Sequence, residues 1–251
     1  MPARLPNSVV GVAGFPAATA QAIANSGGCC RTLTADVTDA AQVEAACVRA
    51  EELLGAPVDI LVNNAGIVVG GHFADTTVAD TVSQVEVNLL APMRVIHLLL
   101  PGMLARRHGH IVNIASVGGL QSNPGIAVYC ATKFGVVGFS EALRSELAGT
   151  GVQVSVICPG LIRTGIAERG VMRGLPRARV DAMMTLGASP ARVGRATVGA
   201  IRRNRALTVV TVHGRMVAWW SRHVPRSYRS LRAVVGRRQR KEIAAARAGG
   251  P

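Results

Sequence analysis

Short apolar segments alternate with helical segments along most of this chain, and this alternation limits the folds that it can adopt. Strands are predicted where Val, Ile and Leu follow one another, at 32–37, 58–66, 109–116, 152–160 and 207–212. Helices are predicted between them, at 39–55, 78–107, 125–151 and 191–204. Continuous apolar strands that alternate with helices form parallel sheets with both faces covered. We therefore expect an α/β fold whose ligand lies beyond the carboxyl ends of the strands.

Composition excludes several other classes of protein. A length of 251 residues suits one α/β domain. The most apolar stretch, 87–105, is interrupted by prolines, an arginine and a histidine, so it falls short of the ~18 apolar residues of a membrane span. The first residues do not have the pattern of a signal peptide. Five cysteines without a C-x-x-C pair favour a reducing compartment, so we expect a cytoplasmic protein, and we expect no metal site.

Three predicted strands end in polar or flexible residues. These residues are Asn-Asn-Ala-Gly at 63–66, Ser116, and Pro159 with Gly160. Because the carboxyl ends of parallel strands meet at one edge of a sheet, they are expected to form one site. The Ser116 hydroxyl would there hydrogen-bond a substrate oxygen, although taken alone this residue is better interpreted as an ordinary turn serine.

The segment YCATK places Tyr129 and Lys133 four residues apart on one face of a predicted helix. An ammonium near a phenol is expected to lower the phenol pKa from ~10 toward neutrality, which makes a general acid or base. The competing interpretation is a solvent-facing lysine beside a half-buried tyrosine. Scarcity argues for the functional interpretation, because the chain has only two lysines and fills its other basic positions with arginine.

Several motifs together resemble the short-chain dehydrogenase/reductase family: NNAG (63–66), VEVNLLAP with Asn88, IVNIAS ending at Ser116, YCATK (129–133) and CPGLIRT (158–164). The resemblance is close over 32–165 and looser elsewhere. It implies a Rossmann-like, three-layer α/β/α fold and hydride transfer between NAD(H) or NADP(H) and an alcohol or ketone. We expect this domain over 1–200, with 201–251 adding the last strand and a basic extension. The resemblance also implies a homo-oligomer, a dimer or a tetramer, built on the helices that carry Asn88 and Tyr129.

The resemblance implies a role for each matching residue. Tyr129 would donate or accept the proton, Lys133 would lower its pKa and hold the nicotinamide ribose, and Ser116 would orient the substrate oxygen. Asn88 would support a water relay to Lys133. Besides Tyr129 and Lys133, the residues implied to bind the cofactor are Asp36, Val37, Asn63, Ala65, Gly66, Pro159, Gly160, Ile162 and Thr164. For Asn63, a turn that ties neighbouring strands together is an equal alternative.

The stretch SVVGVAGFPAATAQAIANSGGCC, residues 8–30, has two interpretations. In the first, AGFPAATAQAIA (13–24) is the family's glycine-rich phosphate loop with Gly14 kept, but only 22 residues then separate Gly14 from Asp36. In the second, which we favour, 7–28 form the second strand and helix, and the fold lacks one strand–helix unit near its N-terminus. A natural start further upstream is a third possibility. Neither interpretation provides a residue that would select NAD over NADP.

The C-terminal segment is strongly basic. Residues 201–251 hold 13 of the 28 lysines and arginines and a single acid, Glu242. An apolar helical face is predicted within 215–241, with Pro225 interrupting the helix: Val217, Trp220, Val224, Tyr228, Leu231 and Val235. Such a segment either packs over the substrate pocket or makes peripheral contact with a membrane. No nucleic-acid-binding module is recognised, so no nucleic-acid partner is expected.

Two functions remain open at this point. The first is an NAD(P)-dependent oxidoreductase that interconverts a hydroxyl and a carbonyl on a hydrophobic small molecule. The second is a catalytically silent relative that binds a ligand or partner, which the missing phosphate loop suggests.

Overall fold

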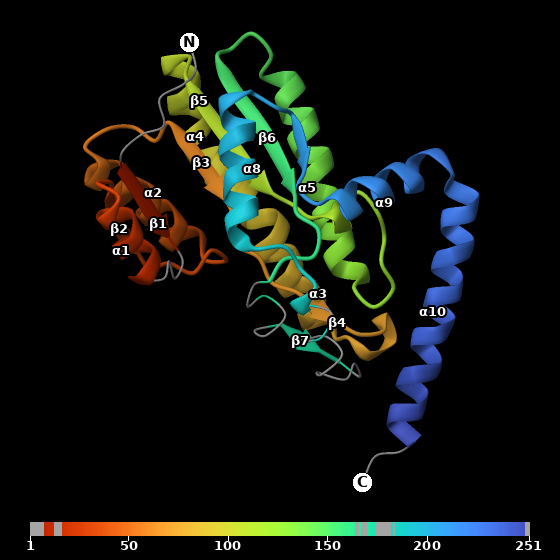
Figure 1. Cartoon of the computed structure of the whole chain (residues 1–251). Helices are drawn as coiled ribbons and strands as arrows, with labels where there is room; N and C mark the ends of the chain where they lie inside the picture. The colour runs from red at the N-terminus through yellow and green to blue at the C-terminus, as the bar shows by residue number, and fades with distance from the viewer. Residues whose placement is uncertain are drawn as a thin grey trace.

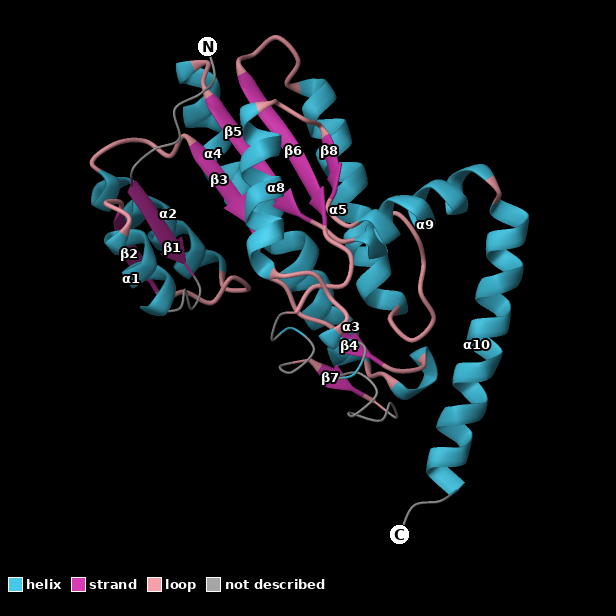
Figure 2. Ribbon diagram, in the orientation of Figure 1, coloured by secondary structure: helices cyan, strands magenta, loops and turns pink. Residues whose placement is uncertain are grey.

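The computed structural model describes residues 8–12, 17–163, 166, 170–173, 182 and 184–248. Its central feature is a parallel four-stranded sheet in the order β3-β5-β6-β8. The four strands are β3 (Ile60–Asn63), β5 (Gly109–Ile114), β6 (Val152–Cys158) and β8 (Leu207–Val209). Helices lie on both sides of this sheet (Figures 1 and 2), which confirms the predicted parallel α/β fold.

Alternate residues of the central strands face two different helical layers. The covering helices are α4 (Ala91–Arg106), α5 (Ala127–Glu146) and α8 (Pro190–Arg202). Ile111 of β5 packs with residues of α4 and α5, whereas its neighbour Val112 packs with Ala200 and Ile201 of α8. Because successive side chains of a strand point to opposite faces, both must be apolar. This explains why the strands appear in the sequence as continuous apolar runs.

The N-terminal segment forms a separate two-stranded sheet. Its elements are β1 (Ser8–Val12), α1 (Ala17–Asn25), β2 (Cys29–Leu33) and α2 (Ala40–Leu54), and α2 packs against α4. In a doubly wound sheet the first strand lies between the second and the fourth. Within the described residues, β1 pairs with β2 and not with β3. This pairing agrees with the interpretation of 8–12 as a second strand. Gly14, the key residue of the other interpretation, lies outside the described residues.

Two predicted element ends can be compared closely with the structure. The helix predicted at 39–55 is confirmed, because Asp39 caps the first turn of α2 and Gly55 ends it with a φ of 64°. The strand predicted at 32–37 is only partly right, because β2 begins at Cys29 and ends at Leu33. Asp36 lies instead in a turn, where its carboxylate accepts hydrogen bonds from both the backbone N–H and the hydroxyl of Thr38.

One long helical stretch, Val78–Arg106, is apolar and long enough to cross a membrane by length and composition alone. A core helix of a soluble protein passes the same test. Ile96 and Met103 of this stretch lie in the core against the sheet. Only 22% of the most apolar 18-residue part of this stretch is buried. Leu98 and Leu104 are exposed and form an apolar surface on α4.

The C-terminal segment forms two helices, α9 (Val212–His223) and α10 (Pro225–Ala248), and so breaks at Pro225 as predicted. The predicted single apolar face is only partly right. Tyr228 is buried, whereas Val224, Leu231 and Val235 are exposed. Val224 has a non-helical conformation (φ −129°, ψ 59°), so the apolar residues before and after it do not form one continuous face.

Candidate active site

The carboxyl ends of β3, β5 and β6 meet at one edge of the sheet. Asn63 lies opposite Asn113 in the β3–β5 register, and Ile114 lies opposite Ile157 in the β5–β6 register. The Val117 N–H donates to the Pro159 carbonyl over 2.8 Å, just beyond the last register pair. The predicted convergence of the strand ends is therefore found at Ser116 and Pro159.

Ser116 begins a short 3-10 turn, η3 (Val117–Gly119), directly after β5. Its hydroxyl accepts a hydrogen bond from the Gly118 N–H at 3.0 Å. This bond fixes the position of the hydroxyl at the end of the strand. A Cβ placed on Gly118 would lie 3.4 Å from both Ser116 Oγ and Tyr129 Cε1, so the serine hydroxyl and the tyrosine ring both lie close to this glycine.

Tyr129 and Lys133 project from the first two turns of α5. The Lys133 Nζ lies 5.8 Å from the centroid of the Tyr129 ring and donates to the Ile114 carbonyl over 3.0 Å. Lys133 is only 4% exposed, so its ammonium is held in a nearly dry site at the end of β5. The solvent-facing lysine of the competing interpretation is therefore excluded. Ser116, Tyr129 and Lys133 come together as predicted.

Burial controls the protonation of both groups. Desolvation raises the pKa of Tyr129, and a hydrogen bond with Ser116 offsets part of that rise. Desolvation lowers the pKa of Lys133 to about 8. The predicted lowering of the Tyr129 pKa is not found in this structure, because desolvation is the largest influence and raises the pKa, while the Lys133 ammonium is directed at the Ile114 carbonyl.

Asn88 lies in a π-helical turn, η2 (Glu86–Leu90), between α3 (Val78–Val85) and α4. Its amide accepts from the Ile67 N–H at 2.8 Å, and donates to the Ile67 carbonyl at 2.9 Å and to Thr132 Oγ1 at 3.3 Å. A Cβ on Gly66 would lie 3.3 Å from Asn88 Oδ1 and 3.7 Å from Lys133 Nζ. Asn88 therefore lies near Lys133, as expected, while its amide forms hydrogen bonds with Ile67 and Thr132.

The residues predicted to bind a cofactor fall into two groups. Those at the edge of the large sheet are Asn63, Ala65, Gly66, Pro159, Gly160 and Ile162. The Asn63 amide donates to Asn113 Oδ1 over 2.9 Å, which is the strand-tying role of the alternative interpretation. Asp36 and Val37 follow β2 on the separate two-stranded sheet. Thr164 lies outside the described residues.

Sequence interpretation missed a second buried amide on the Asn88 face. Gln84 is fully buried, one helical turn before Asn88, and accepts from the Val69 N–H at 3.0 Å. Together the two amides bind the backbone of 67–69. Their spacing of four residues within an apolar helix was a signal that could have revealed the pair.

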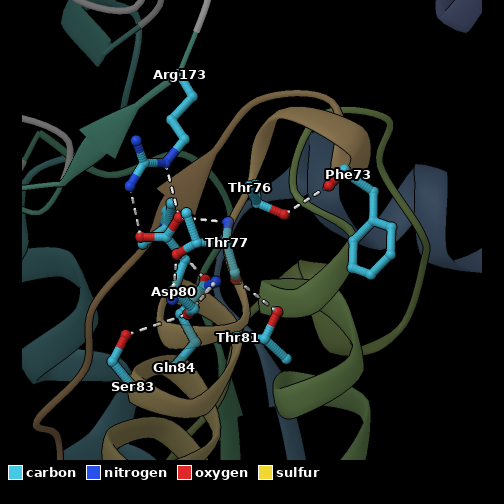
Figure 3. A network of polar contacts seen from close by, with 9 residues as sticks. Phe73, Thr76, Thr77, Asp80, Thr81, Ser83, Gln84 and Arg173 are labelled. Atoms are coloured by element: carbon cyan, nitrogen blue, oxygen red, sulfur yellow. Dashed lines mark hydrogen bonds and ion pairs between the residues drawn. The ribbon is translucent and has the colours of Figure 1, made fainter.

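Sequence interpretation also missed an ion pair that fixes the chain after β6. Two short strands, β4 (Val69–Gly70) and β7 (Val171–Met172), pair in parallel, and Arg173 then reaches Asp80 at the start of α3 (Figure 3). Asp80 also forms a capping box with Thr77. Gly71 has a φ of +138°, and a Cβ there would lie 2.6 Å from the Arg173 carbonyl oxygen. Glycine therefore permits this close approach.

Tyr228 is a further contact to the site that the sequence did not reveal. Its hydroxyl lies 3.0 Å from both Gln121 Oε1 and the Ser122 carbonyl. The Ser221 hydroxyl is directed at the Leu120 carbonyl from α9. The C-terminal helices therefore hold the segment that joins Ser116 to Tyr129.

Comparison with known proteins identifies this arrangement. Residues 8–174 match the family model described as short chain dehydrogenase. The chain belongs to the short-chain dehydrogenase family.

Curated relatives of this short-chain dehydrogenase include ketoacyl reductase HetN of Nostoc sp., 38% identical over 196 residues, which are 77% of this chain and 65% of that protein. Oxidoreductase UcpA of Escherichia coli is 41% identical over 140 residues, 55% of this chain and 53% of that protein. A putative ketoacyl reductase of Streptomyces coelicolor is 46% identical over 136 residues, 53% of this chain and 52% of that protein. The matches thus span about half to two thirds of these relatives.

Solved structures agree with the family assignment. A short-chain dehydrogenase from Streptomyces avermitilis superposes with a TM-score of 0.75 at 26% identity, covering 92% of this chain and 89% of that one. A short-chain dehydrogenase/reductase from Burkholderia phymatum, in complex with NAD, superposes with a TM-score of 0.72 at 29% identity. The superposition covers 80% of this chain and 78% of that one. The Rossmann-like fold of this short-chain dehydrogenase is therefore shown.

The residues of this short-chain dehydrogenase fit a nicotinamide cofactor at one end. Lys133 is a buried cation beside the Tyr129 ring, and the backbone at Gly66 passes close to it. Elsewhere the fit is incomplete, because no glycine-rich phosphate loop lies within the described ranges. Those ranges also hold no group of three or more His, Cys, Asp or Glu that could bind a metal ion.

Proposed function

We propose that this chain is an NAD(P)-dependent oxidoreductase that interconverts a hydroxyl and a carbonyl on a hydrophobic small molecule. The observation that carries the proposal is the convergence of Ser116 and Tyr129 close to Gly118, with the buried Lys133 beside the tyrosine. Ketoacyl reductases among the relatives support a carbonyl substrate. Apolar residues follow Ser116 and precede Tyr129, such as Val117, Leu120 and Ile126, and they favour an apolar substrate.

Tyr129 acts as the proton donor in this proposal. Burial raises its pKa, so the phenol holds its proton at neutral pH and can deliver it to a carbonyl oxygen that is being reduced. Ser116 orients that oxygen by a hydrogen bond. The nicotinamide, when bound, supplies or accepts the hydride. Because Tyr129 is protonated before the reaction, the enzyme is suited to reduce a ketone to an alcohol.

Lys133 holds the nicotinamide ribose and keeps positive charge beside Tyr129. Asn88 positions the backbone of Ile67 and supports a water relay to Lys133. The remaining proposed cofactor contacts are Asp36, Val37, Asn63, Ala65, Gly66, Pro159, Gly160, Ile162 and Thr164. NAD and NADP are both consistent with this set.

The test is the variant Tyr129→Phe, assayed by NADH and NADPH oxidation with aliphatic ketones and a ketoacyl substrate. Loss of the hydroxyl should lower kcat by roughly 10²-fold or more, while the melting temperature stays near that of the unsubstituted protein. Full turnover by this variant would disprove the mechanism.

A catalytically silent scaffold is the second candidate function. It is favoured by the lack of a glycine-rich loop among the described residues. Fluorescence titration with NADH and NADPH separates the two candidates, since micromolar binding supports an enzyme. Absence of binding, together with an intact fold, supports the silent scaffold.

We place the protein in the cytoplasm as a homo-oligomer, a dimer or a tetramer, in contact with a small-molecule substrate. The exposed Leu98 and Leu104 of α4 support an interface on this helix. In this proposal residues 1–200 are the Rossmann-like domain, and 201–251 add its last strand and a basic extension capable of peripheral membrane contact.

A further inference from the structure

The helices α9 and α10 carry apolar side chains that no part of the described chain covers. Val212, Met216 and Trp219 follow one another at the i, i+4, i+7 spacing of one helical face. Met216 is 66% exposed and Trp219 is 59% exposed. Trp219 stacks on His223, with ring centroids 4.9 Å apart, so His223 extends the same face. A tryptophan held in the open in this way is typical of a contact surface.

The second helix continues this surface. Leu231, Val234 and Val235 of α10 are exposed. Tyr228, one turn before Leu231 on the same side of the helix, anchors α10 to the 121–122 segment. Figure 1 shows α10 as a long helix at the edge of the molecule, with the C-terminus at its far end. A Cβ on Gly236, midway along α10, would lie 3.8 Å from Pro124 Cγ, so the first half of the helix lies against the segment before α5. The apolar residues are thus presented from two helices that are fixed to the protein at their junction.

Arginines surround the apolar residues. The described, exposed arginines of α9 and α10 include Arg215, Arg222, Arg226, Arg229 and Arg237. The single acid of 201–251 is Glu242, near the end of α10. A second copy docked by the same face would place arginine against arginine. A polyanion such as DNA would leave Met216 and Trp219 without a partner.

A cavity of about 400 Å³ opens where α9, α10 and the 120–122 segment meet. Its wall includes the apolar side chains of Leu120, Phe134 and Pro225. Arg222 and Arg229 also line it. Apolar walls combined with two guanidinium groups suit the junction between the acyl chains and the phosphate of an anionic lipid.

We infer that the α9–α10 surface binds an anionic lipid bilayer. Met216, Trp219 and the exposed residues of α10 insert at the level of the headgroups, and the arginines contact lipid phosphates. An anionic bilayer is chosen as the partner because α9 and α10 combine exposed apolar side chains with many arginines and a single acid. This inference rests on the peripheral membrane contact proposed for the C-terminal extension and names the class of lipid that it binds. It does not depend on the oxidoreductase activity.

The experiment uses the full chain and two kinds of vesicle, phosphatidylcholine alone and phosphatidylcholine mixed with phosphatidylglycerol. The protein should sediment with the mixed vesicles at least about tenfold more tightly than with phosphatidylcholine, and added salt should weaken binding. The Trp fluorescence should shift to shorter wavelength on binding. Equal affinity for the two vesicles, or no binding to either, would overturn the inference.

Variants locate the surface. Met216→Asp combined with Trp219→Ala should reduce binding to mixed vesicles by about tenfold or more, as should Arg226→Glu combined with Arg229→Glu. The matched control is Val48→Asp, which removes an equally exposed valine on α2 and should leave binding unchanged. An equal loss in the control would contradict the assignment, and so would tighter binding to duplex DNA than to the mixed vesicles. Tyr129→Phe should bind vesicles normally, which separates this result from the outcome of the activity test.

Discussion

Arg173 donates two hydrogen bonds to the carboxylate of Asp80, from Nε over 2.7 Å and from Nη2 over 2.9 Å (Figure 3). The guanidinium is the largest cause of a strongly lowered Asp80 pKa, so the carboxylate stays ionised. The two residues are 93 positions apart. Their ion pair joins the chain after β6 to the start of α3, beside the β4–β7 strand pair. The segment that follows the Pro159 strand end is therefore held at two adjacent points.

Replacing Arg173 with Met should release this attachment while retaining an apolar stem of similar length. We expect a rise in KM of about three- to tenfold with a smaller change in kcat, because a charged bidentate contact is lost outside the reacting groups. Steady-state kinetics with the best ketone substrate provides the measurement.

Arg163→Met is the control for this prediction, since Arg163 is exposed and precedes the same segment. It should leave KM unchanged. If both substitutions raise KM equally, the cause is the loss of one positive charge and not the loss of the contact with Asp80.

Loss of the Lys133 charge should limit activity at alkaline pH. Its pKa is lowered to about 8, so kcat/KM of the free enzyme should fall as pH rises through 8. Lys133→Arg keeps its charge at every accessible pH. Its kcat/KM is expected to be lower throughout but to lack the decline above pH 8. A decline that persists in this variant would assign the titration to another group.

Tyr228→Phe should weaken the link between α10 and the segment from Ser116 to Tyr129. The lost hydroxyl leaves Gln121 and the Ser122 carbonyl without that partner, at a cost of about 1 kcal/mol in the free energy of unfolding. We expect kcat to fall a few-fold as well, because Ser116 and Tyr129 are joined by this segment. Ser230→Ala, an exposed change on the same helix, serves as the control for urea unfolding and kinetics.

His110 should make the protein less stable in mild acid. Its Nε2 lies 2.8 Å from Ser155 Oγ, whose proton goes to the Arg205 carbonyl, so the ring donates from Nε2. Burial lowers its pKa from 6.5 to about 4. The unfolded chain therefore binds an extra proton between these pH values.

Above pH 6.5 His110 is neutral in both the folded and the unfolded protein, and the free energy of unfolding is not reduced. As pH falls from 6.5 to 4, protonation of the unfolded chain lowers the free energy of unfolding by roughly 3 kcal/mol. Urea unfolding of the unsubstituted protein and of His110→Gln should show this pH dependence only in the former. His97→Gln, an exposed histidine change, should behave like the unsubstituted protein.

Local patterns in the sequence predicted most of the elements that carry the site. The apolar runs of β5 and β6 are long and buried on both faces, so they are recognisable without knowledge of their partners. Tyr129 and Lys133 lie within four residues of one helix, and helix geometry alone brings them to one face. Ser116 ends a buried strand, but its selection as a site residue rests on the resemblance of IVNIAS to the family motif. The strand at 32–37 was misplaced because the Asp36 turn bonds depend on side-chain geometry that composition does not record.

Contacts between distant segments could not be predicted in this way. The Asp80–Arg173 pair and the Tyr228 contact with 121–122 join residues 93 and 106 or more positions apart, and either residue alone is an ordinary polar side chain. The protonation of Tyr129 was mispredicted for the same reason. A lysine four residues from Tyr129 is visible in the sequence, but the burial that raises the Tyr129 pKa arises from the packing of the whole chain.

The sequence by itself determined the parallel α/β architecture and the place of Tyr129 and Lys133 on one helical face, because both depend on short-range periodicity. Ser116 joined them as a predicted site residue through the family resemblance. Tertiary structure decided which strand β1 pairs with, where the Lys133 ammonium is directed, and which faces of α9 and α10 stay exposed. Pairing, desolvation and exposure depend on which distant surfaces meet, and no local pattern specifies that.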